Sequence, residues 1–442
     1  MYKRQVEDLG SLVEERGPES FIIRTRDYWR AWVNKESLDF ADLPASILEL
    51  YRRSLLTMRV QIDNRGAAIA STDSDITEVL GDTYSYVWGR DGAFAAKALD
   101  MAHYDEVSHQ FFDFCADVIT SEGYLLHKYT PDGSLAGQWM PWADEEGKLQ
   151  LPIQEDETAL VLYSLWHHYY RFHNVEFIRS QYRTLIKNAA DFMVSYREPY
   201  TNLPAPSYDL WEERRGIHSF TVAAVWAGLR AAANFTEMFG EVALTKRYRQ
   251  AAAEIKEAAI EYLFDKKLKR FLRSIKVDAD GVVEPDYIID SSICGPFLFG
   301  MLQATDPLIE STMVALMDRL WCKTEVGGIA RYENDRYQQV SQDTAKVPGN
   351  PWFVCTMWIA QYYIARAQSV DDLKPALQIL IWAQHHALPS GVLAEQVHPY
   401  SCAPLSVSPL TWSHAAVVIA IHEYIDKYRE LRTRVHHRQK DR

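Results

Sequence analysis

The sequence contains little cysteine and no long apolar run. Its five cysteines include no CxxC pair and are odd in number, so neither a disulfide framework nor a zinc or redox site of that type is expected. The sequence contains no run of about 18 apolar residues, so no membrane-spanning helix is expected. The first residues, MYKRQVEDLGSLVEERG, lack the apolar core of a signal peptide. We therefore expect a soluble, cytoplasmic protein with reduced thiols.

Several signatures of cofactor and metal chemistry are missing as well. The chain has no GxSxG, no GxGxxG after a strand, no P-loop and no HExxH, and its 14 histidines show no metal-ligand spacing. A net charge of -13 disfavours binding to nucleic acid or to an anionic membrane. We expect no cofactor, no bound metal and a neutral small-molecule ligand.

Helical periodicity is the dominant pattern in the sequence. It predicts helices over residues 44–66, 91–103, 105–119, 156–172, 175–197, 218–239, 241–262, 286–303, 305–320, 351–368, 371–387 and 409–431. Every second helix starts about 60–70 residues after the previous one, near 91, 156, 218, 286, 351 and 409. Strand-like alternation is confined to short stretches near 124–130, 269–275 and 281–289. The period indicates six helical hairpins of similar size.

Six similar hairpins favour an all-α fold that closes into an (α/α)6 barrel. One set of helices, such as 351–368, is apolar around most of its circumference, as inner helices should be, and the other, such as 241–262, carries more charge. An open α-solenoid is the alternative, but it would not need long Trp- and Gly-rich loops at one end only. We assign residues 41–435 to the barrel and 1–40 to an N-terminal lead-in or linker segment. Residues 26–40 are expected to pack on the outside of the barrel.

Unusual residues gather in the loops that precede the apolar helices. The motif YSYVWGRD sets the pair Arg90 and Asp91 close to Tyr84 and Trp88. A helix cap with a local ion pair is one interpretation. A polar grip on sugar hydroxyls between aromatic walls is the interpretation that we favour. Trp139, in QWMPW, is equally consistent with a sugar platform and with a packed loop.

Two glutamates stand in loops on opposite sides of the predicted ring. Glu212 follows Trp211 in SYDLWEERRG; a solvated charge run is the ordinary interpretation, but an aromatic neighbour raises the pKa of a carboxyl, as a general acid requires. Glu395 is an isolated carboxylate three periods later. Glycosidic cleavage uses two carboxyl groups across the bond, and a wide separation leaves room for a water and favours inversion. Arg331, in a Gly-flanked loop, is a candidate ligand clamp.

Seven motifs occur in the order YSYVWGRD, PIQEDETAL, YDLWEER, ARYEND, GNPWF, AEQ and LTWS. In these motifs, over about residues 26–431, the chain resembles glycoside hydrolase family 15, the glucoamylases and their relatives. The resemblance implies an (α/α)6 barrel and an inverting mechanism, with Glu212 as general acid and Glu395 as general base. It implies further contacts with the sugar from Tyr84, Arg90, Asp91, Trp211, Glu213, Arg331 and Trp412.

The resemblance predicts release of glucose from the non-reducing ends of α-1,4-linked glucans or malto-oligosaccharides. Trehalose and α-1,6-linked glucans are alternative substrates within the same family. A disaccharide phosphorylase and a non-catalytic glucan-binding protein are alternatives of other classes. The chain departs from the family in two places: GKLQLPIQ lacks the tryptophan that fungal members place there, and the N-terminal β-sandwich of prokaryotic members is an expected partner domain that this chain does not contain.

Overall fold

The N-terminal forty residues form a unit of their own. The computed structural model describes residues 2–35, 38–77, 82–137, 140–144 and 147–440, and the chain divides into residues 1–40 and residues 41–442. The first unit contains α1 (Tyr2–Arg16) and α2 (Pro18–Val33). Proline at the first position of α2 suits the start of a helix, because the N–H that it lacks would have no partner within the helix.

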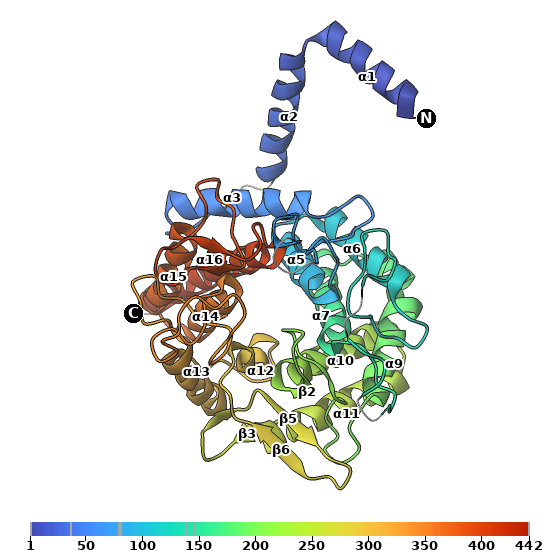
Figure 1. The fold of residues 1–442 in the computed structure, drawn as a ribbon, viewed down its shortest axis with the longest axis vertical. Coiled ribbons are helices and arrows are strands. Elements are labelled where there is room, and N and C mark those ends of the chain that lie inside the picture. Colours follow the sequence, from blue (N-terminus) through green and yellow to red (C-terminus); the bar gives the residue numbers. More distant parts are fainter. Residues whose placement is uncertain (1, 36–37, 78–81, 138–139, 145–146, 441–442) are drawn as a thin grey trace. The chain divides into compact units, whose positions relative to one another are not determined.

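Six helices of the second unit form the inner ring of an (α/α)6 barrel. They are α5 (Gly89–Met101), α7 (Glu155–Phe172), α10 (Ser219–Met238), α12 (Gly295–Leu298), α14 (Phe353–Arg366) and α16 (Thr411–Lys440). Each helix packs against the next in this order, and α16 packs against α5, so the ring closes (Figure 1). The predicted barrel is confirmed, and the open solenoid is excluded.

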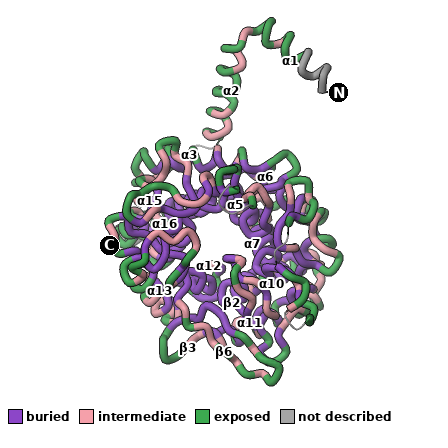
Figure 2. The backbone as a smooth tube through the Cα atoms, viewed as in Figure 1, coloured by how far each residue is buried: buried purple, intermediate pink, exposed green. Residues whose placement is uncertain are grey.

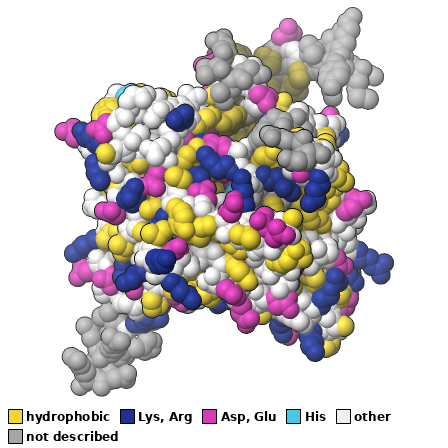
Figure 3. All heavy atoms as spheres, turned by 60° about the horizontal axis from the view of Figure 1, so that its bottom comes forward, with side chains coloured by type: hydrophobic (Ala, Val, Ile, Leu, Met, Phe, Trp, Pro, Cys, Tyr) yellow, Lys and Arg dark blue, Asp and Glu magenta, His cyan; other side chains and the backbone are white. Residues whose placement is uncertain are grey.

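A second layer of helices surrounds this ring. It comprises α3 (Ala45–Val60), α6 (Asp105–Val118), α8 (Val175–Gln181), η1 (Tyr182–Lys187), α9 (Asn188–Ser195), α11 (Val242–Ala258), η2 (Ala259–Leu263), α13 (Pro307–Leu320), η4 (Val370–Leu373) and α15 (Lys374–His385). The inner helix α14 is buried along most of its length, whereas the outer helix α11 buries one face (Figure 2). Acidic and basic side chains are interspersed on the outer surface drawn in Figure 3. The apolar character of the inner helices therefore follows from their being covered on all sides.

Short antiparallel strands lie in the connections between helices. A four-stranded sheet has the order β1 (Ser207–Tyr208), β2 (Arg215–His218), β5 (Ser274–Val277) and β6 (Val283–Asp286). Two hairpins pair β3 (Phe264–Asp265) with β4 (Arg270–Phe271), and β7 (Gln396–Val397) with β8 (Pro404–Leu405). In the register, Ser207 lies opposite Gly216, and Gln396 lies opposite Leu405. These pairings hold the two predicted catalytic glutamates, since one lies in the turn between β1 and β2 and the other directly precedes β7.

The prediction of a long helix over residues 286–303 is wrong. That stretch leaves β6, forms the short turn η3 (Ser291–Cys294) and continues into the four-residue α12. Asp290 starts the helical segment by accepting a hydrogen bond from the N–H of Ser292, and Gly300, at φ 76°, follows soon after its end. The strand predicted over 124–130 reduces to isolated bridges at Tyr129. Within the described residues, no helix is long and apolar enough to cross a membrane.

Candidate active site

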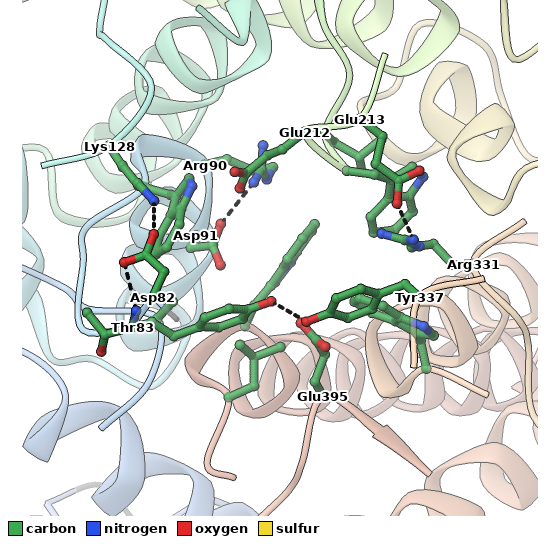
Figure 4. Close-up of a pocket in the computed structure, with 18 residues that line it drawn as sticks. Asp82, Thr83, Arg90, Asp91, Lys128, Glu212, Glu213, Arg331, Tyr337 and Glu395 are labelled. Atoms are coloured by element: carbon green, nitrogen blue, oxygen red, sulfur yellow. Dashed lines mark hydrogen bonds and ion pairs between the residues drawn. The ribbon is translucent and has the colours of Figure 1, made fainter. Parts of the chain in front are cut away.

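The ends of the inner helices and the loops before them line one pocket, with a cavity of about 290 Å³ (Figure 4). Its lining consists of Ala70, Asp82, Thr83, Tyr84, Trp88, Arg90, Asp91, Lys128, Leu210, Trp211, Glu212, Glu213, Arg331, Tyr337, Trp352, Glu395, Leu410 and Trp412. Ten of the eleven predicted site residues belong to this set. The eleventh, Trp139, lies outside the described residues.

Arg90 and Asp91 lie at the start of α5, where a buried charge network holds them. Nη1 of Arg90 donates to Oε1 of Gln154 at 2.7 Å and to Oδ2 of Asp156 at 3.3 Å. Nη2 of Arg90 lies 3.4 Å from Oδ2 of Asp91, and the guanidinium lies 5.3 Å from the ring centre of Trp412. Burial raises the pKa of Asp91 to about 6, although the charge of Arg90 acts in the opposite direction. The network therefore fixes both side chains before a ligand arrives.

Glu212 occupies a tight turn between β1 and β2. Its backbone has φ 63°, in the left-handed region that residues other than glycine rarely adopt. Asp209 holds the turn, because its carbonyl accepts from the N–H of Glu212 at 2.9 Å and its carboxylate accepts from the N–H of Glu213 at 2.8 Å. Oε2 of Glu212 lies 2.5 Å from Nε2 of His127. The turn and this hydrogen bond together hold the carboxyl at the pocket wall.

Glu213 and Arg331 are bonded to each other beside the pocket. Nη2 of Arg331 lies 2.5 Å from Oε1 of Glu213, and the hydroxyl of Tyr332 donates to Oε2 at 2.6 Å. Nε and Nη2 of Arg331 also donate to Asp335, at 2.9 and 2.8 Å. Burial raises the pKa of Glu213, but the charge of Arg331 and the bond from Tyr332 outweigh it and leave the pKa below its ordinary value. The Arg331 guanidinium lies 5.3 Å from the ring centre of Trp211, so this ion pair is part of a rigid aromatic wall.

Glu395 lies across the pocket from Glu212, directly before β7 (Figure 4). It is 4% exposed, and its Oε2 accepts a hydrogen bond from Nε2 of Gln396 at 3.1 Å. Burial raises the pKa of Glu395 to about 7, because hydrogen bonds from Ser406 and Gln396 offset only part of the loss of hydration. The hydroxyl of Tyr337 lies 3.3 Å from Oγ of Ser406, so the groups that hydrogen-bond to Glu395 and to each other here are neutral. The charges of Arg331 and Asp335 act on the pKa of Glu395 in opposite directions.

The raised pKa predicted for Glu212 is wrong. Burial does raise this pKa, but the hydrogen bond and charge of His127 and two further cationic side chains outweigh it, and the pKa lies below its ordinary value. Nε1 of Trp211 is directed elsewhere and donates to both carboxylate oxygens of Asp290 at 3.1 Å. The free site therefore favours a proton on Glu395 rather than on Glu212.

Five buried polar atoms around the pocket have no hydrogen-bond partner among the described residues. They are Nε1 of Trp88, Trp352 and Trp412, Nε of Arg90 and Oδ2 of Asp91. Buried polar atoms are nearly always hydrogen-bonded, so a concentration of unsatisfied ones in a pocket indicates a polar ligand. Four of the atoms donate and one accepts, which suits a ligand rich in hydroxyl groups, since each hydroxyl does both.

A comparison with known protein families agrees with this chemistry. The model described as Glycosyl hydrolases family 15 matches residues 45–380, which is more than half of the chain. The chain belongs to glycosyl hydrolase family 15. The resemblance inferred from the motifs is thereby confirmed.

This family 15 chain is similar to two curated proteins and to one solved structure described below. An uncharacterized glycosyl hydrolase from Methanocaldococcus jannaschii is 28% identical, with 85% of this chain and 56% of that protein covered. A protein named trehalase 2 from Sulfolobus acidocaldarius is 24% identical, with 89% and 66% covered. The crystal structure of a bacterial glucoamylase complexed with acarbose has a TM-score of 0.66 at 23% identity, with 86% and 57% covered. The chain thus spans between about half and two thirds of each of these proteins, and the structural likeness supports the barrel fold.

Potential metal ligands and thiols in the described part of this family 15 chain have the following arrangement. No group of three or more His, Cys, Asp or Glu side chains there is placed to hold a metal ion. All five cysteines are free thiols, and four of them are buried. Burial raises the pKa of the Cys115 and Cys294 thiols well above the ordinary value, which keeps them protonated and weakly nucleophilic.

Eight of the lining residues at this family 15 site, and His127 beside it, were not singled out by the sequence analysis. Lys128, Tyr337 and Trp352 line the pocket, and His127 contacts Glu212. Trp352 lies in the motif GNPWF, so the motif itself could have indicated it. No local pattern could have indicated His127, because the residue that it contacts is 85 positions away.

Proposed function

We propose that this family 15 glycosidase is an inverting, exo-acting α-glucosidase that releases terminal glucose from α-linked glucosides. The observation that carries the proposal is the placement of Glu212 and Glu395 on opposite walls of one pocket (Figure 4). Two carboxyl groups on opposite sides of the scissile bond are what glycosidic cleavage requires, and inversion needs room for a water between them.

The polar atoms near Arg90 and Asp91 support binding of a terminal sugar. Unsatisfied donors and an acceptor surround the pocket, and tryptophan rings supply an apolar wall for the face of a sugar ring. The cavity, of about 290 Å³, is at the small end of the range for ligand sites, which suits the end of a chain better than its middle.

In the proposed reaction, Glu212 gives its proton to the glycosidic oxygen as the bond from that oxygen to the anomeric carbon breaks. The bonding electrons leave with the oxygen, which becomes a hydroxyl of the leaving group. Glu395 takes a proton from a water whose oxygen bonds to the anomeric carbon from the opposite face. One proton has then moved from Glu212 to Glu395, and exchange with solvent restores the starting state.

The opposite pKa shifts support these roles through acid and base strength. Cationic groups around Glu212 stabilise the carboxylate that remains after proton transfer, so Glu212 is the stronger donor. Burial makes Glu395 the stronger acceptor. When the two glutamates share one proton, the free site holds it mainly on Glu395. The reactive form, with the proton on Glu212 and Glu395 ionised, is a minor form of the same one-proton state. Above about pH 7 the pair loses this proton, and kcat/KM should fall.

Substrate choice within this proposal lies between malto-oligosaccharides and trehalose. The similarity to a protein named trehalase 2 favours trehalose as a second candidate. Both substrates end in an α-linked glucose, so the same pocket would bind either. A disaccharide phosphorylase is disfavoured, because phosphate would replace the water that Glu395 is proposed to activate.

Two measurements test the proposal. The first scores free glucose from maltose, maltoheptaose, isomaltose and trehalose, with and without inorganic phosphate. We expect hydrolysis of at least one of them without phosphate, and a strict phosphate requirement would contradict the proposal. The second follows α-glucosyl fluoride by NMR. An inverting enzyme releases β-glucose first, so an initial α-glucose signal would exclude inversion.

A further inference from the structure

His127 packs its imidazole against the carboxyl of Glu212. Nε2 of the ring lies 2.5 Å from Oε2 of the carboxyl; the His127 side chain is fully buried, and that of Glu212 is 22% exposed. The ring also makes an edge contact with Trp88, at 6.5 Å between centroids. The N–H groups of Val87 and Tyr129 donate to each other's carbonyls at 2.8 and 2.9 Å, which fixes the backbone next to the histidine. The fold therefore holds His127 in place independently of the carboxyl.

The carboxyl of Glu212 faces charged or titratable groups from several elements. They are His127 and Lys128 in the connection between α6 and α7, Arg90 and Asp91 on α5, Glu157 on α7, and Tyr84 in the loop before α5. Lys128 directs its ammonium to Oδ2 of Asp82 at 3.0 Å, and Nη1 of Arg90 bonds to Gln154. His127 makes direct hydrogen-bond contact with Glu212.

The direction of this hydrogen bond follows from the charge of the carboxyl. The pKa of Glu212 lies below its ordinary value, so the side chain is ionised in the free site and its oxygens accept. Nε2 of His127 therefore carries the proton in this contact.

We propose that His127 is a positioning residue for Glu212: its Nε2–H fixes Oε2, leaves Oε1 to carry the transferred proton, and stabilises the carboxylate that the transfer creates. This inference rests on the general-acid role proposed above for Glu212, which does not itself require a histidine. During the reaction the proton on Oε1 moves to the glycosidic oxygen, and the proton on Nε2 stays where it is. The Nε2–H bond strengthens as the carboxylate forms, because its acceptor then carries a full negative charge.

A contact that strengthens as the bond breaks acts on kcat more than on KM. It also acts only on substrates whose leaving group needs a proton. A merely structural histidine would instead affect every substrate of the pocket alike. This difference makes the inference testable with α-glucosyl fluoride, because fluoride leaves without protonation.

Two variants separate the hydrogen-bond donor from the charge. His127→Ala removes both, and His127→Gln offers a neutral N–H donor. On maltose or trehalose, whichever is hydrolysed faster, we expect His127→Ala to lower kcat about 10- to 100-fold with little change in KM. The acidic limb of its kcat/KM profile should move up by about one pH unit, because the pKa of Glu212 rises when the adjacent cation is lost. His127→Gln should recover much of kcat but not the position of this limb. Both variants should hydrolyse α-glucosyl fluoride at close to the wild-type rate.

The outcomes distinguish this inference from the function on which it rests. Glu212→Gln should lose the disaccharide activity and keep the fluoride activity; full disaccharide activity in that variant would refute the general-acid role itself. If Glu212→Gln behaves as expected and His127→Ala keeps the wild-type kcat and acidic limb, the inference about His127 is overturned and the proposed function stands. An equal loss by His127→Ala on the disaccharide and on the fluoride would also overturn it.

A measurement without substrate tests the contact directly. Proton NMR of protein labelled with ¹⁵N-histidine should show a strongly deshielded imidazole N–H for His127, as short hydrogen bonds to a carboxylate do. We expect the signal to be absent in His127→Gln, to move upfield in Glu212→Gln, and to be unchanged in His385→Ala, where an exposed histidine at the end of α15 is replaced. His168, whose Nδ1 lies 2.8 Å from Oδ1 of Asp100, is a second source of such a signal, so a spectrum in which Glu212→Gln moves no deshielded signal would contradict the pairing. Circular dichroism of each variant checks that it folds.

Discussion

The two walls of the pocket shift the pKa of a glutamate side chain in opposite directions. Both glutamates are removed from water to a large extent, and burial alone would raise the pKa of each. Glu212 contacts His127 and lies near other cations, and its pKa is lowered. Glu395 contacts the neutral Gln396, and its pKa rises to about 7. The comparison teaches that contacts with the carboxyl, and not its depth, decide the sign of the shift.

The largest expected effect comes from removing either carboxylate. Glu212→Gln and Glu395→Gln should each lower kcat on the preferred disaccharide by about 10²- to 10⁴-fold, because each removes one proton-transfer step. On α-glucosyl fluoride the two variants should differ: Glu212→Gln should stay active, because fluoride leaves without protonation, and Glu395→Gln should not. Glu241→Gln, which alters a surface ion pair with Lys187, is the control. The opposite pattern on fluoride would reverse the two roles.

Disrupting the cationic wall should also lower stability. Arg90 is 2% exposed and pairs with Asp91, Asp156 and Glu157. Arg90→Ala would leave these carboxyls without their cation, and we expect a loss of about 3–5 kcal/mol in the free energy of unfolding. Urea denaturation measures it.

Arg249→Ala is the matched control for this prediction. Arg249 pairs with Glu237 at the surface, where about 0–1 kcal/mol is expected. Equal losses in the two arginine variants would show that the buried network contributes no more than a surface pair.

The contributions of the two glutamates to the stability of the protein should change with pH in opposite directions. The pKa of Glu395 is higher in the folded protein than in the unfolded chain, so its stabilising contribution is present below the unfolded pKa and is lost as pH rises through about 7. Glu395→Gln should therefore be more stable than wild type at pH 8, by about 1–3 kcal/mol, and equally stable at pH 4.

For Glu212 the sign is reversed, because its folded pKa is lowered. Its contribution is present above the unfolded pKa and is lost as pH falls through the folded pKa. Glu212→Gln should therefore be less stable than wild type at pH 8, with the difference closing in acid. Thermal unfolding across pH 4–8 compares the two variants, and parallel curves would contradict the comparison of the walls.

The smallest effect should come from a neutral neighbour of Glu395. Gln396→Leu removes the N–H that Oε2 accepts, so the pKa of Glu395 should rise further and the alkaline limb of kcat/KM should move up by less than about one unit. Lys128→Met, on the other wall, should move only the acidic limb, because Lys128 lowers the pKa of Glu212. If both variants shifted the same limb of the kcat/KM profile, the assignment of the acidic limb to Glu212 and of the alkaline limb to Glu395 would be wrong.

Much of the fold could be predicted because helical periodicity is a local property. The inner helices α5, α7, α10 and α14 begin and end within a few residues of the predicted positions. Two inner helices depart from the prediction. Helix α16 continues to Lys440, nine residues beyond its predicted end at 431. In the stretch 286–303, Asp290 starts the helical segment late and Gly300 follows closely after its end. Asp290 and Gly300 are visible in the sequence, and the hairpin of β5 and β6 that precedes them is local. The apolar residues between Asp290 and Gly300 nevertheless have the pattern of a longer helix.

The sequence by itself determined the barrel, the family and ten residues that the structure brings to one pocket. It could do so because apolar periods are short-range and because motif order survives when sequences diverge. Only the tertiary structure decided that His127 lies against Glu212, that Trp211 donates to Asp290 instead, and that Glu395 takes the raised pKa. The reason is physical: hydrogen bonds and electrostatic shifts depend on separations of a few ångströms, and the fold sets these between residues far apart in the chain.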